Sequence, residues 1–253
     1  MSKTLVCTNV LENVKSLPFG SHCQEWFRLG RNTNDDFIFF HPERFSIDNA
    51  RTQAANYAME LECDYIYFID DDMILSPNTY KSLKACDADV AMAHTYIRGY
   101  PFDVMFFKIE EQKKNIRNFS GMDRRLIHYN DWENHIDESG LVECHAVGFA
   151  CALLKVKNLL EIPPPFFVTG PQQTEDVYYC MKLKYHKPES RIVVDTKVPT
   201  GHLLSPEVIT ISTRKKLMEY YKPEIEENKS GDRGEEYKKL NLENNTQWED
   251  ANV

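Results

Sequence analysis

Three consecutive aspartates, Asp70, Asp71 and Asp72, follow directly on the apolar run DYIYFI. Adjacent carboxylates repel one another, and an unpaired buried carboxylate is costly. Because alternate residues of an extended chain point the same way, we expect Asp70 and Asp72 on one side and Asp71 on the other. Two convergent carboxylates are hard oxygen ligands for Mg²⁺ or Mn²⁺, whose charge would remove their repulsion. The sequence therefore predicts a divalent-cation site, with a solvated acidic turn as the competing interpretation.

Two later stretches carry groups that could complete such a site. Glu175 and Asp176 stand at the start of a predicted helix, where a carboxylate can act as a general base or simply offset the helix dipole. His202 follows a predicted strand and Gly201, and a neutral imidazole is a good ligand for Mn²⁺. Taken singly, each of these groups also has an ordinary structural interpretation, as a capping acid or a loop histidine.

Alternating strands and helices would have to position these groups. Apolar runs typical of strands occupy residues 3–10, 35–41, 64–69, 88–96, 148–156 and 191–198, and the stretch through Arg31 is mixed in character. Helical patterns occupy residues 45–64, 76–86 and 175–186, the second with Ser76 as its expected cap. This alternation implies βαβ units and a largely parallel sheet, whose ligands bind beyond the carboxyl ends of the strands. The three aspartates hold that position after the strand 64–69.

Composition and charge limit the class of protein. A chain of 253 residues, 42% of them hydrophobic, can bury a substantial core, and its net charge of −9 disfavours a nucleic-acid partner. Its 7 cysteines form no C-x-x-C pair, which indicates reduced thiols in a cytoplasmic protein. We expect no signal peptide, and no apolar stretch reaches the roughly 18 residues of a membrane span. The composition predicts a globular domain over residues 1–222 and a polar tail, a peripheral helix or disordered, over 223–253.

The ordered motifs resemble those of one family. DNARTQAANYAMELECDYIYFIDDDMILSPNTYKSL, which starts at Asp48, resembles the donor-binding half of GT-A fold glycosyltransferases of the family-2-like group, including their D-x-D motif. VGFACALLKVKNLLEI, TEDVYYCMKL and VDTKVPTGHL resemble the later glycine, acid pair and metal-binding histidine of that family, so the resemblance covers residues 3–205. It implies a Rossmann-like α/β fold in a single domain, with a mixed, mostly parallel sheet flanked by helices.

The resemblance also implies roles for individual residues. The metal ion, Mn²⁺ or Mg²⁺, would be bound by Asp70, Asp72 and His202. The donor nucleotide-sugar would contact Thr8, Arg51, Asp70, Asp71 and Gly148. Asp176 would be the catalytic base, and Glu175 would bind or orient the acceptor.

The implied activity is metal-dependent transfer of one sugar, with inversion, from a nucleotide-diphosphate sugar to a hydroxyl of a glycan or glycolipid. A UDP-sugar is the expected donor, and the absence of the Q-x-x-R-W motif of processive synthases favours transfer of a single sugar. Two alternatives stay open: a phage-type glycosyltransferase acting on a modified DNA base, and a non-catalytic glycan-binding module of the same fold. A haloacid-dehalogenase-type phosphatase would carry D-x-D after its first strand, and a sugar nucleotidyltransferase would show a glycine-rich basic N-terminal loop. The sequence shows neither.

Acceptor specificity is expected to come from three loops, at residues 98–102, 108–134 and 163–174. Aromatic residues in these loops could stack on sugar rings or could belong to the core, and the sequence favours neither interpretation. These residues are Tyr100, Phe102, Trp132, Phe166 and Phe167.

Overall fold

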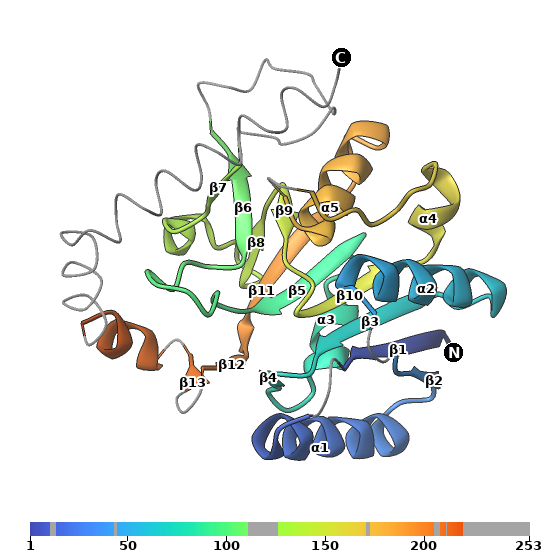
Figure 1. Ribbon diagram of the computed structural model, residues 1–253, viewed down its shortest axis with the longest axis horizontal. Coiled ribbons are helices and arrows are strands. Elements are labelled where there is room, and N and C mark those ends of the chain that lie inside the picture. Colours follow the sequence, from blue (N-terminus) through green and yellow to red (C-terminus); the bar gives the residue numbers. More distant parts are fainter. Residues whose placement is uncertain are drawn as a thin grey trace.

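In the computed structural model of this chain, the described residues are 1–10, 14–42, 45–110, 126–170, 173–204, 208–210 and 212–219. A seven-stranded sheet forms the centre of the molecule, in the order β2-β1-β3-β10-β5-β11-β8 (Figure 1). Its strands are β1 (Lys3–Asn9), β2 (Asp36–Phe40), β3 (Tyr65–Asp70), β5 (Val90–His94), β8 (Leu141–Glu143), β10 (Cys151–Lys155) and β11 (Ile192–Pro199). Only β10 and β8 run against the other five strands. The predicted class, α/β with a mixed, mostly parallel sheet, is confirmed.

Helices cover both faces of this sheet (Figure 1). One face carries α2 (Ile47–Glu60) and α5 (Glu175–His186), and the other carries α1 (Ser16–Asn32) and α3 (Thr79–Ala85), while the short α4 (Lys157–Glu161) follows β10. Successive strand residues alternate between the two cores: Leu5 and Ile66 join the core under α2, and Val6 and Tyr67 join the core under α3. A sheet covered on both faces leaves its strand ends as the place for ligands.

The strand that leads to the aspartates is a rigid part of the frame. Residues 66–69 of β3 have no exposed surface, as expected for a central strand rich in β-branched and aromatic side chains. The small side chains of Ala54, Ala55 and Ala58 are also fully buried and let α2 lie close to β1 and β3. This packing fixes the end of β3 and the first turns of α2, where Asp70 and Arg51 are found.

Two three-stranded antiparallel sheets extend the central one. The first contains β4 (Met73–Ile74), β12 (Gly201–Leu203) and β13 (Val208–Ile209), with β12 in the middle, and the second places β6 (Phe106–Ile109) between β7 (Leu126–His128) and β9 (Ala146–Val147). In the first sheet, His202 pairs with Met73, and the amide of Leu203 donates to the carbonyl of Asp72 at 3.0 Å. Backbone pairing thus brings the predicted metal-binding histidine beside the aspartates.

The structure differs from the sequence prediction in three places. Residues 16–32 form α1, which the sequence does not predict because Pro18, Gly20 and Gly30 obscure its helical pattern. The N-cap of α3 is Asn78 rather than Ser76, whose hydroxyl donates instead to the carbonyl of Pro199. The strand expected from residue 148 begins at Cys151, after a turn.

Other predictions can be compared directly with the structure. All seven cysteines are free, as predicted. Four of the five loop aromatics belong to the core, because Phe102, Trp132, Phe166 and Phe167 are at most 8% exposed. No helix in the described ranges is long and apolar enough to cross a bilayer. The tail over 223–253 lies outside the described residues, so the boundary at residue 222 stays a prediction.

Candidate active site at the carboxyl edge of the sheet

The predicted site residues gather at one edge of the sheet, where β1, β3, β5 and β11 end and the antiparallel β10 begins. We call this the carboxyl edge. A cleft of about 400 Å³ opens there between the ends of β1 and β3, the start of α2 and the loop after β5. Its walls are formed by Asn9, Val10, Pro42, Phe45, Ser46, Ile47, Ala50, Asp70, Asp71, Asp72 and Arg98. Two clusters of charged side chains lie at this edge.

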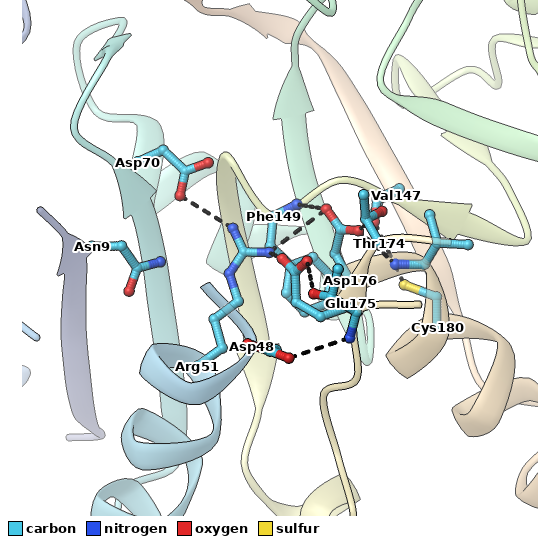
Figure 2. Close-up of polar contacts among 12 residues, drawn as sticks. Asn9, Asp48, Arg51, Asp70, Val147, Phe149, Thr174, Glu175, Asp176 and Cys180 are labelled. Atoms are coloured by element: carbon cyan, nitrogen blue, oxygen red, sulfur yellow. Dashed lines mark hydrogen bonds and ion pairs between the residues drawn. The ribbon is translucent and has the colours of Figure 1, made fainter. Parts of the chain in front are cut away.

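The first cluster, the Arg51 cluster, consists of Arg51, Asp70, Glu175 and Asp176 (Figure 2). Arg51 Nη2 lies 3.1 Å from Asp70 Oδ1, and Nη1 contacts Glu175 Oε1 and lies 3.6 Å from Asp176 Oδ2. The guanidinium is 2% exposed and sits 5.5 Å from the ring centres of both Phe68 and Phe149. One buried cation therefore ties the end of β3 to the start of α5.

Burial changes the proton affinities in the Arg51 cluster. Desolvation would lower the pKa of Arg51, but its three carboxylate partners outweigh this and raise it, so the guanidinium stays charged. Burial raises the pKa of Asp70 in spite of the opposing effect of Arg51. Burial likewise raises the pKa of Glu175 to about 7. The positive charge of Arg51 opposes this rise, and the negative charge of Asp176 adds to it. A carboxyl group with a pKa near neutrality is of the kind found at catalytic sites.

Asp176 is held by hydrogen bonds to both of its carboxylate oxygens. Its Oδ1 accepts from the amide of Val177 at 2.7 Å and from the hydroxyl of Thr174, and its Oδ2 accepts from the amide of Phe149 at 3.1 Å. A β-carbon added at Gly148 would lie 3.5 Å from Asp176 Oδ2 and 2.7 Å from the end of the Met105 side chain. Glycine at position 148 thus leaves space directly in front of this carboxylate.

The second cluster, the Asp72 cluster, consists of Asp72, His202 and Arg98. Asp72 Oδ2 lies 3.3 Å from His202 Nε2 and 2.8 Å from Arg98 Nη1. Burial tends to raise the pKa of Asp72, but His202 and Arg98 together bring it below its usual range. The other oxygen, Oδ1, is buried and has no hydrogen-bond partner. Buried polar atoms without partners are rare, so this oxygen marks a place where a ligand can add.

Two of the three predicted metal ligands fit a divalent cation. His202 Nδ1 lies 2.7 Å from the carbonyl oxygen of Tyr96, which can only accept, so Nδ1 carries a proton and Nε2 is the ring nitrogen directed at Asp72. Asp72 adds the partnerless Oδ1. Asp70 instead directs Oδ1 at Arg51, and the described part of the chain contains no group of three or more His, Cys, Asp or Glu residues arranged to hold a metal. Asp72 and His202 could therefore bind a cation whose other ligands come from a substrate or water.

The donor-binding residues implied by the resemblance occupy different depths. Thr8 is 1% exposed, and Asn9, which sequence reasoning missed, lines the cleft next to Asp70. Asn9 is the last residue of β1, and its place at the carboxyl end of a predicted strand could have identified it from the sequence as a cleft residue. Asp71 lines the cleft as well, because β3 ends at Asp70 and residues 71–72 form a turn in which strand alternation no longer applies. Arg51 lies behind the cleft, among its carboxylates.

Comparisons with known proteins support the fold. No protein-family model matches the chain, and no curated protein sequence is detectably similar. Among solved structures, A197 from STIV is 17% identical with a TM-score of 0.53, and the match covers 82% of this chain and 93% of that one. HddC from Yersinia pseudotuberculosis (12% identity, 80% and 93% covered, TM-score 0.36) and UDP-glucose pyrophosphorylase complexed with UDP-glucose (9% identity, 88% and 100% covered, TM-score 0.44) are more distant. The likeness to A197 is one of fold.

Proposed function

We propose that this protein is a metal-dependent glycosyltransferase that moves one sugar from a nucleotide-diphosphate sugar to an acceptor hydroxyl. A UDP-sugar is the first donor to test. The observation that carries the proposal is the arrangement at the carboxyl edge. There, Asp72, which contacts His202, lines a cleft on one side of Asp70. The buried acid pair Glu175–Asp176 lies on the other side of Asp70, across Arg51. This arrangement provides separate places for a diphosphate and for a proton acceptor.

Asp72 and His202 would hold Mn²⁺ or Mg²⁺ together with the donor diphosphate. When bound, such an ion acts as a Lewis acid that offsets the negative charge developing on the departing diphosphate. The firm position of His202, which its hydrogen bond to Tyr96 and the pairing of β12 with β4 provide, keeps Nε2 directed at Asp72. Asn9 and Asp71 line the same cleft and would contact the nucleotide.

Asp176 would take the proton from the acceptor hydroxyl. As this oxygen forms its bond to the anomeric carbon, the bond from that carbon to the diphosphate breaks on the opposite face, which inverts the configuration. Asp176 is the more exposed acid of the pair, 10% against 4% for Glu175, and its contact with Arg51 at 3.6 Å is the longest of its contacts. We therefore propose that Oδ2 accepts the proton while Glu175 holds Arg51. General-base assistance of this kind contributes about 10²- to 10⁴-fold.

The acceptor class, a glycan or glycolipid, follows from the family resemblance. A modified DNA base is the less favoured acceptor, because the net charge of −9 would repel a nucleic acid.

Hydrolysis of nucleotide-sugars tests this function before the acceptor is known. The wild-type protein, incubated with Mn²⁺ and a panel of UDP-, GDP-, CDP- and ADP-sugars, should slowly release the nucleoside diphosphate from one donor class, and EDTA should stop the release. Asp72→Asn should abolish the release, whereas the matched control Asp36→Asn, an exposed aspartate at the opposite edge of the sheet, should not. No release from any donor would instead favour a non-catalytic glycan-binding module.

A further inference from the structure

We propose that Arg98 is a phosphate-binding residue that pairs with Asp72 until a nucleoside diphosphate enters the cleft, and then transfers its guanidinium to that ligand. The inference rests on the proposed function, because it specifies how the same cleft recognises a diphosphate. It also implies that the cleft prefers two linked phosphates to one.

The contact between Arg98 and Asp72 is built to be exchanged. Arg98 Nη1 lies 2.8 Å from Asp72 Oδ2, yet the arginine side chain is 57% exposed and the aspartate side chain 17%. Ion pairs with a partner that is largely in water are weak, so a second anion can displace this one at little cost. Arg98 contacts the same oxygen, Oδ2, that lies beside His202 Nε2, so its positive charge stands next to the place where a cation would bind.

The charge of the cleft requires a positive group for any phosphate ligand. Three aspartates, residues 70–72, line its walls, and Arg98 is the only lysine or arginine among the described lining residues. A guanidinium presents a fork of N–H donors that matches two phosphate oxygens, which makes arginine better suited than lysine to this contact. One divalent cation together with Arg98 supplies the positive charge for two phosphates.

The backbone around Arg98 is held in place, so the exchange needs only side-chain rotation. The amide of Ile97 donates to the carbonyl of Asp103 at 2.9 Å, and the amide of Phe102 donates to the carbonyl of Gly99 at 2.7 Å. From the helix over residues 212–219, Arg214 Nε donates to the carbonyl of Phe102 at 2.5 Å. Arg98 is therefore an exposed side chain on a hydrogen-bonded loop.

This arrangement predicts two opposite effects of Arg98→Gln. Without Arg98, Asp72 is free for a cation, so Mn²⁺ alone should bind several-fold more tightly than to the wild type. The nucleoside diphosphate with Mn²⁺ should bind about tenfold more weakly, as expected for loss of a hydrogen-bonded charge contact, whereas the monophosphate should bind almost unchanged. Arg98→Lys should fall between the wild type and Arg98→Gln.

Calorimetry and spin resonance of free Mn²⁺ measure both effects. The probes are Mn²⁺ alone, then the tightest binder among UDP, GDP, CDP and ADP with Mn²⁺, then its monophosphate. Arg31→Gln is the matched control, because Arg31 is an exposed arginine at the far end of α1, stacked on Phe27. It should leave all three affinities unchanged.

The outcomes separate this proposal from the proposed function. If the wild type binds the diphosphate with Mn²⁺ and Arg98→Gln binds it equally well, or binds Mn²⁺ alone no better, the role of Arg98 is wrong while the function stands. If both effects appear but no nucleotide-sugar is ever cleaved, the role of Arg98 stands and the glycosyltransferase activity is wrong. If the wild type binds no nucleoside diphosphate, both are wrong.

Discussion

The two charged clusters at the carboxyl edge differ in how they satisfy their charges. In the Arg51 cluster, α2, β3 and α5 supply the groups, and the guanidinium finds three carboxylates inside the protein. In the Asp72 cluster, a turn, a loop and a short strand supply the groups, one partner is 57% exposed, and Asp72 Oδ1 has no partner at all. The comparison indicates that the first cluster is a closed frame that positions the acids and that the second is left open for a ligand.

Removing the positive charge of the Arg51 cluster should have the largest effect on the stability of the protein. Arg51→Met leaves three carboxylates at a buried site without their shared partner, and we expect it to lower the free energy of unfolding by about 3–5 kcal/mol. Urea denaturation measures this change. Arg51→Lys, which keeps one positive charge, should lose clearly less. Wild-type stability in Arg51→Met would contradict the view of this cluster as a frame.

Substitution of Asp176, the proposed base in the Arg51 cluster, should slow sugar transfer without weakening ligand binding. Asp176→Asn keeps the size of the side chain and one accepting oxygen, and should slow sugar transfer about 10²- to 10⁴-fold because the proton acceptor is lost. Binding of the nucleoside diphosphate with Mn²⁺ should not change. Single-turnover transfer assays and calorimetry separate the two, and transfer at nearly the wild-type rate would remove Asp176 from its proposed role.

The closed cluster should also make stability depend on pH. Burial raises the pKa of Glu175 from 4.5 to about 7, so between these values the folded protein holds a proton that the unfolded chain releases. The contribution of this group to stability is therefore full below pH 4.5, falls as the pH rises, and is lost above about pH 7. Urea denaturation across this range should show a steeper decline for the wild type than for Glu175→Gln. Parallel profiles would show that Glu175 titrates normally.

Changes in the open cluster should have the smallest effect on stability. Asp72→Asn should change the free energy of unfolding by about 1 kcal/mol or less, since its contact with Arg98 is largely in water. The same urea titration that is used for Arg51→Met provides the measurement. A loss as large as that of Arg51→Met would mean that the two clusters have the same structural role, and the comparison would fail.

The parts predicted from sequence are those that local patterns determine. The apolar run before the aspartates gives β3, the alanine spacing gives α2, and the acid pair opens α5 at Glu175 as predicted. Strand order, the reversed direction of β10 and the pairing of β12 with β4 depend on contacts between distant segments, and the sequence carries no local signal for them.

The contacts among the site residues also depend on distant segments coming together, so the sequence alone could not predict them. Arg51 was expected at the nucleotide, but in the structure it is buried against Phe68 and Phe149 and is the cation of a carboxylate cluster. Arg98 was missed because an arginine in a loop has no distinctive pattern, and its contact with Asp72 appears only when the loop after β5 is placed next to that residue.

The most direct test of the open cluster is a calorimetric titration of the wild-type protein with UDP, GDP, CDP and ADP, with Mn²⁺ and then with EDTA. We predict that one nucleoside diphosphate binds, that binding requires the cation, and that Asp72→Asn abolishes it. Equal affinity with Mn²⁺ and with EDTA, or undiminished binding to Asp72→Asn, would contradict the assignment of Asp72 and His202 to a cation–diphosphate site.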